Sequence, residues 1–250
     1  MTATGQRTTV AAEKTTHGAA AAEPQGRVAR RQRRNREALI HAATAVMGEK
    51  GIDAATMQEI AERADLGAGT IYNYFKSKDE LAVAVLEELM VELALRIERV
   101  TFDDPAQVYA FGIHTVLATA TTDGRWKQML YRSEVIADAL YRRMGPFAIR
   151  DLRNAVQAGR FFVADAELTW RLTAHAIVGA ALAVTTGALP AGAREAAIAQ
   201  LLCMTGIGAE AASALAALPL PPLPDMPAAA ATPAHRRHAR PAPTAAAQGE

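Results

Sequence analysis

The chain has 250 residues, a length typical of two domains or of one unit with two parts. Half of the residues are apolar, only 5% are aromatic, and the formal net charge at pH 7 is +1. This composition excludes a polycation and supplies enough apolar material for a core, and the abundant alanine favours helices over strands. The single cysteine, Cys203, excludes an intramolecular disulfide and a cysteine-based metal cluster.

The N-terminal region is rich in Thr, Ala and Gly and shows no helical periodicity, so residues 1–26 are expected to be disordered. It contains no apolar segment of the secretory type, and a cytoplasmic location is expected. Six arginines then lie within residues 27–36, with no acid among them until Glu37. A solvated helix start is the ordinary interpretation of such a run, but the lack of a compensating acid favours nucleic acid as the partner. The six are Arg27, Arg30, Arg31, Arg33, Arg34 and Arg36.

The next segments predict a long helix followed by a short one. Apolar residues recur at helical spacing from residue 31 to residue 50, and Gly51 follows as a stop signal. A short helix opens at Thr56, which forms a capping box with Glu59, and it ends near Ala64.

A third, short helix is predicted for residues 68–75, after a turn. Ile71 and Phe75 lie four residues apart and should face inward, which leaves the intervening polar side chains outside. Ser77 and Glu80 form a second capping box that starts a long helix. The apolar stripe of that helix consists of Leu81, Val85, Leu89 and Leu93.

Two short helices joined by a tight turn, behind a longer supporting helix, form the helix-turn-helix arrangement. The second helix has to enter a major groove about 12 Å wide, and the small residues at its start permit a close approach to base edges. Its N-terminal dipole also favours phosphate. The hydroxyl groups of Thr70, Tyr72 and Tyr74 and the ammonium group of Lys78 suit phosphate oxygens, although ordinary core tyrosines and a solvated lysine are the alternatives.

Residues 55–81 resemble the DNA-binding signature of the TetR/AcrR family of bacterial regulators, and the resemblance extends over about residues 33–93. The shared features are Ile-Ala on the second helix, Gly-Thr-hydrophobic-Tyr-x-x-Phe on the third, and Lys-x-x-Leu at the start of the fourth. One departure is Asp65, where the family usually has glycine. Because aspartate tolerates a left-handed conformation, the turn is expected to survive.

The resemblance implies a homodimer whose two recognition helices enter successive major grooves of a palindromic operator in double-stranded DNA. Asn73 is then the side chain that can make a bidentate contact, with adenine as its usual partner. Arg31 and Arg34, from the arginine run, complete the predicted DNA contacts. Carried over by position, Thr56 and Lys78 contact phosphates, Ala68, Gly69, Thr70 and Asn73 lie at or near bases, and Tyr72 and Tyr74 contact the backbone.

The predicted fold is all-α, with an N-terminal three-helix DNA-binding domain and a C-terminal helical bundle for ligand binding and dimerisation. Further helices are expected at about 105–121, 125–144, 146–158, 166–187 and 193–216. The last two are apolar nearly all round, so a two-fold mate is expected to cover them, the alternative being core helices of a monomer. The uncharged stretch 172–189 is long enough to cross a membrane, but its Ala, Gly and Thr content favours an interface helix.

A ligand pocket in this bundle is expected to use bulky side chains, although such residues are more often plain core. The candidates are His114, Trp126, Met129, Tyr141, Phe147, Phe161, Trp170 and His175. They identify no chemical class of effector, and no cofactor or metal is expected.

No catalytic motif was found in the sequence, and Glu134, Asp138 and Arg142 are spaced as a surface ion ladder. The leading hypothesis is a ligand-responsive repressor. The alternatives are an activator or nucleoid-associated protein without a small ligand, and a helical enzyme or carrier that only looks like a DNA reader. The expected organisation is 1–26 disordered, 27–93 DNA-binding with the motif at 56–75, 94–217 effector-binding and dimerising, and 218–250 a disordered Pro/Ala-rich tail.

Overall fold

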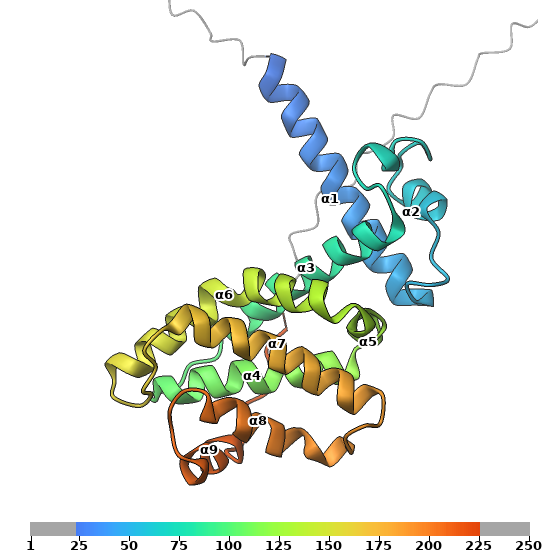
Figure 1. Ribbon diagram of the computed structural model, residues 1–250. Coiled ribbons are helices and arrows are strands. Elements are labelled where there is room, and N and C mark those ends of the chain that lie inside the picture. The colour runs from blue at the N-terminus through green and yellow to red at the C-terminus, as the bar shows by residue number, and fades with distance from the viewer. Residues whose placement is uncertain (1–23, 226–250) are drawn as a thin grey trace, which may run out of the picture.

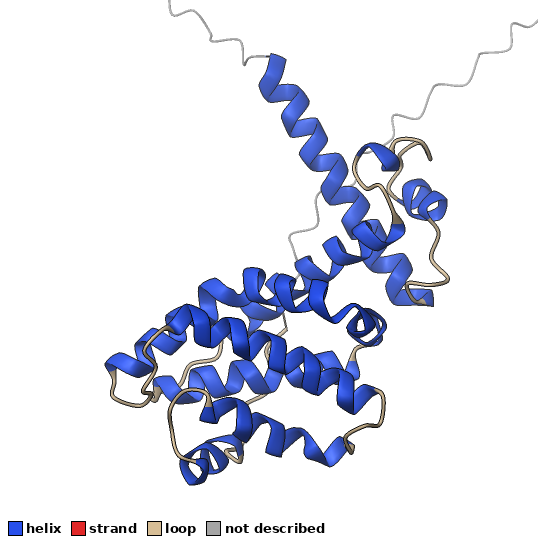
Figure 2. Ribbon diagram, in the orientation of Figure 1, coloured by secondary structure: helices blue, strands red, loops and turns tan. Residues whose placement is uncertain are grey.

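The computed structural model describes residues 24–225, and the disorder predicted for residues 1–23 and 226–250 lies outside that range. All regular structure in the described range is helical, which confirms the all-α prediction (Figure 2). The α-helices are α1 (Pro24–Lys50), α2 (Met57–Arg63), α3 (Lys78–Ile97), α4 (Pro105–Thr122), α5 (Gly124–Met129), α6 (Ser133–Gln157), α7 (Ala166–Thr185), α8 (Arg194–Cys203) and α9 (Ala209–Ala216). Short 3₁₀ helices are η1 (Ile71–Asn73), η2 (Leu130–Arg132) and η3 (Ala191–Ala193).

The helices form two groups that share α3 (Figure 1). The first group consists of α1, α2 and the segment that leads into α3, and the second is a bundle of α4 to α9. One continuous apolar core runs from Leu39 on α1 to Ala216 on α9. The predicted boundary between residues 93 and 94 falls inside α3, so one uninterrupted helix belongs to both groups.

Helix α3 forms where the sequence predicts it. The Ser77 hydroxyl accepts the N–H of Glu80 at 3.1 Å, and the Glu80 carboxylate accepts the N–H of Lys76 at 2.7 Å, which confirms the capping box. The predicted stripe is buried at Leu81, Val85 and Leu93, and Leu89 is half-buried.

Helix α1 begins earlier than predicted, at Pro24 instead of residue 31. Proline is well tolerated in the first turn of a helix because its missing N–H has no intrahelical partner there, and arginine is a good helix former. The arginine run is therefore helical, and it includes an i,i+4 ion pair between Arg33 and Glu37.

The segment predicted as a helix over residues 68–75 is shorter and tighter. Residues 68–70 form a turn and only η1 is helical, because glycines at 67 and 69 weaken an α-helix at this point. The hydrogen bonds run from residue i+3 to residue i, as from Tyr74 N to Ile71 O at 3.0 Å. The turn before it contains Asp65 at φ 57°, which confirms that aspartate accepts the left-handed position.

The bundle differs from prediction at two glycines. Gly145 was expected to separate helices 125–144 and 146–158, but α6 runs through it and through the adjacent Pro146. Gly145 has a packing role instead, since a Cβ atom there would lie 3.4 Å from the Trp170 indole nitrogen. Residues 193–216 were expected to form one helix, yet Gly206 at φ +82° separates α8 from α9.

We expect Gly206→Ala to destabilise the protein by about 2 kcal/mol or more, since alanine disfavours the left-handed region. Its Cβ would also lie 2.6 Å from the Phe162 carbonyl oxygen. Gly208→Ala is the matched control, because a Cβ there meets nothing within 4 Å. Thermal unfolding of the two variants checks this, and equal melting temperatures would contradict it.

The expected disordered tail also needs a correction at its start. Residues 218–225 run back from α9 to the C-terminal end of α3, where Arg96 donates to the Pro224 carbonyl at 2.9 Å and Arg99 to the Asp225 carbonyl at 2.9 Å. Leu223 packs against the core. Prolines lower the entropic cost of ordering an extended segment, which sequence periodicity does not reveal.

Candidate nucleic-acid interface and ligand cavity

Helix α2 begins at the predicted cap. The Thr56 hydroxyl accepts the N–H of Glu59 at 3.2 Å, which satisfies one free donor of the first turn. The Glu59 side chain does not complete the expected box, because it forms an ion pair with Lys50 at 2.7 Å. This pair fixes α2 to the end of α1.

The segment that follows is held from behind by two apolar side chains. Ile71 and Phe75 are buried as predicted, and the Arg36 guanidinium lies 5.1 Å from the centre of the Phe75 ring. The opposite side of the segment faces solvent: Ala68, Gly69, Tyr72 and Asn73 are exposed and Thr70 is half-exposed. The arrangement leaves a short polar surface on a rigid support.

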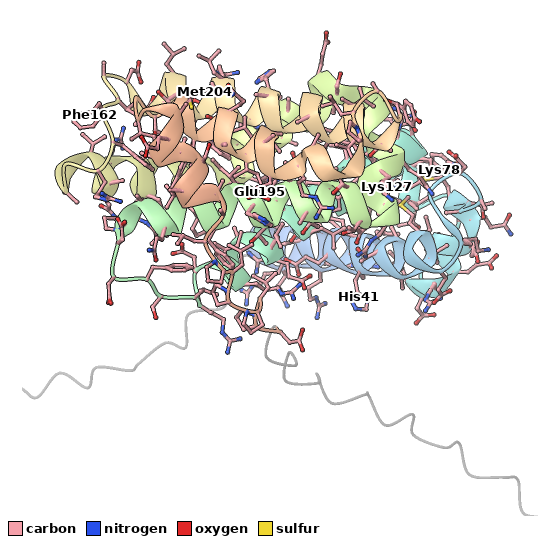
Figure 3. The ribbon with its side chains drawn as sticks, turned by 90° about the horizontal axis from the view of Figure 1, so that it is seen from below. His41, Lys78, Lys127, Phe162, Glu195 and Met204 are labelled. Carbon is pink, nitrogen blue, oxygen red and sulfur yellow. The ribbon has the colours of Figure 1, made fainter. Side chains whose placement is uncertain are left out.

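Two predicted contact residues point elsewhere. Tyr74 was expected to face outward, but it is half-buried and its hydroxyl accepts from the Asn35 side chain on α1 at 3.1 Å. Lys78, labelled in Figure 3, was expected to face a phosphate, and its ammonium group donates to the Asp53 carbonyl at 2.7 Å. Both residues therefore fix the segment between α1 and α3.

The N-terminal half of α1 extends beyond α2 and the segment after it (Figure 1). The arginines on these turns are exposed, including the two predicted contacts, Arg31 and Arg34. Among residues 24–225, carboxylate partners are found for Arg33 but for none of Arg27, Arg30, Arg31 and Arg34. The N-terminal half of α1 therefore presents a positively charged surface beside the exposed polar segment of residues 68–73.

The bundle encloses a small cavity of about 30 Å³ between α3, α4, α6 and α7. Two of the predicted pocket residues, Phe147 and Trp170, line it, and Phe161 packs edge-on behind another lining residue, Tyr109, at 5.7 Å between ring centres. The rest of the wall was missed. It consists of Ala94, Ile97, Tyr109, Gly112, Ile113, Val116, Met144, Ala148 and Asp151.

The other predicted pocket residues lie outside this cavity. Tyr141 accepts the Trp170 N–H through its backbone carbonyl at 3.1 Å. His114 is half-buried on α4, where burial and nearby Arg194 lower its pKa. His175 is exposed on α7, and its Nδ1 pairs with the Arg171 carbonyl. The remaining two, Trp126 and Met129, are buried in α5.

Asp151 is the charged side chain of the cavity wall and is nearly buried. Burial raises its pKa, and the neighbouring Arg150 opposes this by donating to Oδ1 from Nε at 3.0 Å and from Nη2 at 2.7 Å. Arg150 also binds Glu98, at the end of α3, through two contacts of 2.6 Å. A sequence signal existed, since Asp151 lies at helical spacing from the buried Met144 and the half-buried Phe147 and Ala148.

The fold and the exposed segment define the class: an all-helical protein with an N-terminal helix-turn-helix and a separate helical bundle. Residues 39–85 match the family model described as bacterial regulatory proteins, tetR family, and residues 104–217 match the tetracyclin repressor-like C-terminal domain. The chain belongs to the TetR family of transcriptional regulators.

Individual relatives agree with this assignment. The transcriptional repressor KstR of Mycolicibacterium smegmatis is 30% identical over 110 residues, which are 43% of this chain and 54% of KstR. The chain thus spans about half the length of this curated relative. A solved structure of RolR in complex with resorcinol is 29% identical with a TM-score of 0.71, covering 78% of this chain and 100% of that one. Thermus thermophilus FadR in complex with lauroyl-CoA, at 22% identity and a TM-score of 0.55 over 67% of this chain and 93% of that one, shares the fold.

Proposed function

We propose that this protein is a homodimeric repressor in the cytoplasm that binds a palindromic operator and leaves it when a small molecule enters the bundle. The observation that carries the proposal is the exposed segment from Ala68 to Asn73, held rigidly by the buried Ile71 and Phe75. A polar segment of this size, supported by packed helices, suits the major groove.

The proposed DNA contacts follow from exposure. Tyr72, 58% exposed, and Asn73 reach out from η1, and Ala68, Gly69 and Thr70 allow the backbone to approach base edges. Thr56 is exposed at the start of α2, where phosphate is favoured. Tyr74 and Lys78 support these groups from within the fold through the hydrogen bonds to Asn35 and Asp53.

The arginines of α1 supply the charge contacts. We expect the double change Arg31→Ala and Arg34→Ala to weaken binding to operator and random DNA alike, since phosphate contacts carry no base information. With two lost contacts in each protomer, the slope of log affinity against log salt should fall in magnitude by about 3.6. Arg153→Ala, an exposed arginine on α6, is the control. A salt titration by fluorescence anisotropy measures the slope, and an unchanged slope would exclude this role.

The dimer interface is proposed at α7, with α8 and α9 beside it. Helix α7 is long and apolar enough to cross a membrane by composition, but it packs against α4, α6 and α8. Its outer face exposes Leu168 and Leu172, by 54% and 52%, in line with Gly179 two turns further on. Exposed leucines on the outer face of a helix, here beside the exposed His175, suit a protein contact, and a two-fold mate presents an identical face.

Helix α3 is the proposed connection between effector and DNA. The first turn of α3 follows the exposed segment from Ala68 to Asn73 in the chain. The last turns of α3 contribute Ala94 and Ile97 to the cavity wall. A molecule that enlarges the cavity has to displace α3 or its neighbours, because packed interiors deform little. That RolR, a similar protein, has been solved in complex with resorcinol supports a small effector.

Gel shifts with genomic fragments test the proposal most simply. The full chain should shift a DNA fragment that carries an inverted repeat, and some compounds from a panel of small metabolites should abolish the shift. Retention without release by any metabolite would favour a nucleoid-associated protein or an activator without a small ligand, and failure to retain any fragment would contradict DNA binding.

A further inference from the structure

The hydrogen-bonding groups of the cavity define the chemistry of the molecule that it accepts. We infer that the effector is a small, uncharged ring compound with a hydroxyl group, which donates its hydrogen bond to Asp151. This inference rests on the proposed function, because it takes the cavity between α3, α4, α6 and α7 as the effector site.

The donors at the cavity wall are already engaged. The Trp170 indole N–H donates to the Tyr141 carbonyl at 3.1 Å. The Tyr109 hydroxyl lies 3.4 Å from the Thr173 hydroxyl, which itself donates to the Thr169 carbonyl at 2.8 Å. A ligand that brings only acceptors therefore finds no free donor among these groups.

Asp151 offers the complementary group. Its Oδ1 accepts both contacts from Arg150, whereas Oδ2 makes no hydrogen bond within residues 24–225. A carboxylate oxygen at an apolar wall binds a donor strongly, since hydrogen bonds to charged groups are about twice as strong as those between neutral ones. The free acceptor selects a ligand with an O–H group.

The negative charge beside the cavity excludes hydroxyl compounds that also carry a carboxylate. Asp151, Arg150 and Glu98 form a connected trio with two carboxylates and one guanidinium, so the polar side of the cavity is net negative. A ligand carboxylate placed beside Asp151 would be repelled at close range in a medium of low dielectric constant. A neutral hydroxyl group meets no such penalty.

Shape favours a single ring. The wall includes the aromatic side chains of Trp170 and Phe147 and the flexible chain of Met144, which suit a planar apolar body. A benzene-sized molecule needs a cavity of about 150 Å³, so the present 30 Å³ has to widen. Widening moves the wall that Ala94 and Ile97 of α3 form, and Arg150 links Asp151 to Glu98 on the same helix.

The experiment uses calorimetry on the full chain with phenol, toluene and benzoate as probes. Phenol should bind at least about tenfold more tightly than toluene and benzoate. Asp151→Asn keeps the shape and removes the charge, and it should lower phenol affinity about tenfold while leaving toluene unchanged. Glu134→Gln, an exposed acid on the same helix, is the control and should bind phenol like the wild type.

Equal binding of phenol and toluene, tighter binding of benzoate, or no phenol binding at about 10 mM would overturn the inference. If Asp151→Asn fails to fold in a thermal melt, the ranking of the three probes on the wild-type chain decides alone. A parallel gel shift without probes separates the two claims. Loss of operator binding there defeats the proposed function, whereas a wrong probe ranking with intact operator binding defeats only the inference about the ligand.

Discussion

Replacing Leu172 with arginine should convert the dimer to monomers and lower operator affinity by at least about a hundredfold. Leu172 lies in the middle of α7 and is 52% exposed in the protomer, so the change leaves the protomer core intact. In a two-fold interface the arginine appears twice on one apolar patch, and burying unpaired charge costs several kcal/mol. A monomer binds only one half-site of the operator. It therefore loses the gain in affinity that a dimer has, because the first bound protomer holds the second close to the other half-site.

Analytical ultracentrifugation and gel shifts measure this outcome. Leu95→Arg is the matched control, because Leu95 is also an exposed leucine, at 42%, but lies on α3. It should remain dimeric and retain the operator. A Leu172→Arg protein that stays dimeric, or a monomer that binds the operator as tightly as the wild type, would show that α7 does not form the interface.

Replacing Asn73 with alanine should strongly reduce discrimination of the operator from random DNA. Asn73 is the exposed amide of η1, and an amide that binds adenine through two hydrogen bonds is worth about 1–3 kcal/mol of discrimination. Because a dimer contains two copies, the specific complex should lose about 2–6 kcal/mol, which is roughly thirtyfold to ten-thousandfold in affinity. Binding to random DNA should stay the same, because phosphate contacts remain.

Competition gel shifts with operator and random duplexes measure both affinities. Asn154→Ala, an exposed asparagine on α6, is the control and should change neither. An equal loss on the two duplexes would mean that Asn73 acts on the backbone or on stability, and the base-reading role would be wrong.

Local chemistry made much of the N-terminal half predictable from sequence. Thr56 and Ser77 cap the helices they were expected to cap, because a short hydroxyl side chain satisfies an N–H that has no other partner. Ile71 and Phe75 are buried, and Asp65 adopts the left-handed turn. These features depend on neighbours within a few residues, which sequence spacing encodes directly.

Features that depend on distant neighbours were not predictable in the same way. Gly145 was predicted as a helix break, but Trp170 of α7 packs on that glycine and α6 continues. Gly206 read as helical, yet the Phe162 carbonyl occupies the space a side chain would need there. The hydrogen bond from Lys78 to the Asp53 carbonyl joins residues 25 apart in the chain, and sequence spacing does not reveal it.

The candidate ligand residues show the same limit. The search for bulky residues selected Trp126 and Met129, which lie in α5 away from the cavity. It overlooked Asp151, the acid in the cavity wall. Asp151 lies on the buried side of α6, and an acid at such a position is a better guide to a site than aromatic size.

Selection of bound duplexes from a random pool by the full chain tests the central claim most directly. Two recognition segments related by a two-fold axis predict an enriched inverted repeat, with half-site centres about one helical turn, 10–10.5 base pairs, or a multiple of it apart. Enrichment of an asymmetric single site, or recovery of the pool without any sequence preference, would contradict the account.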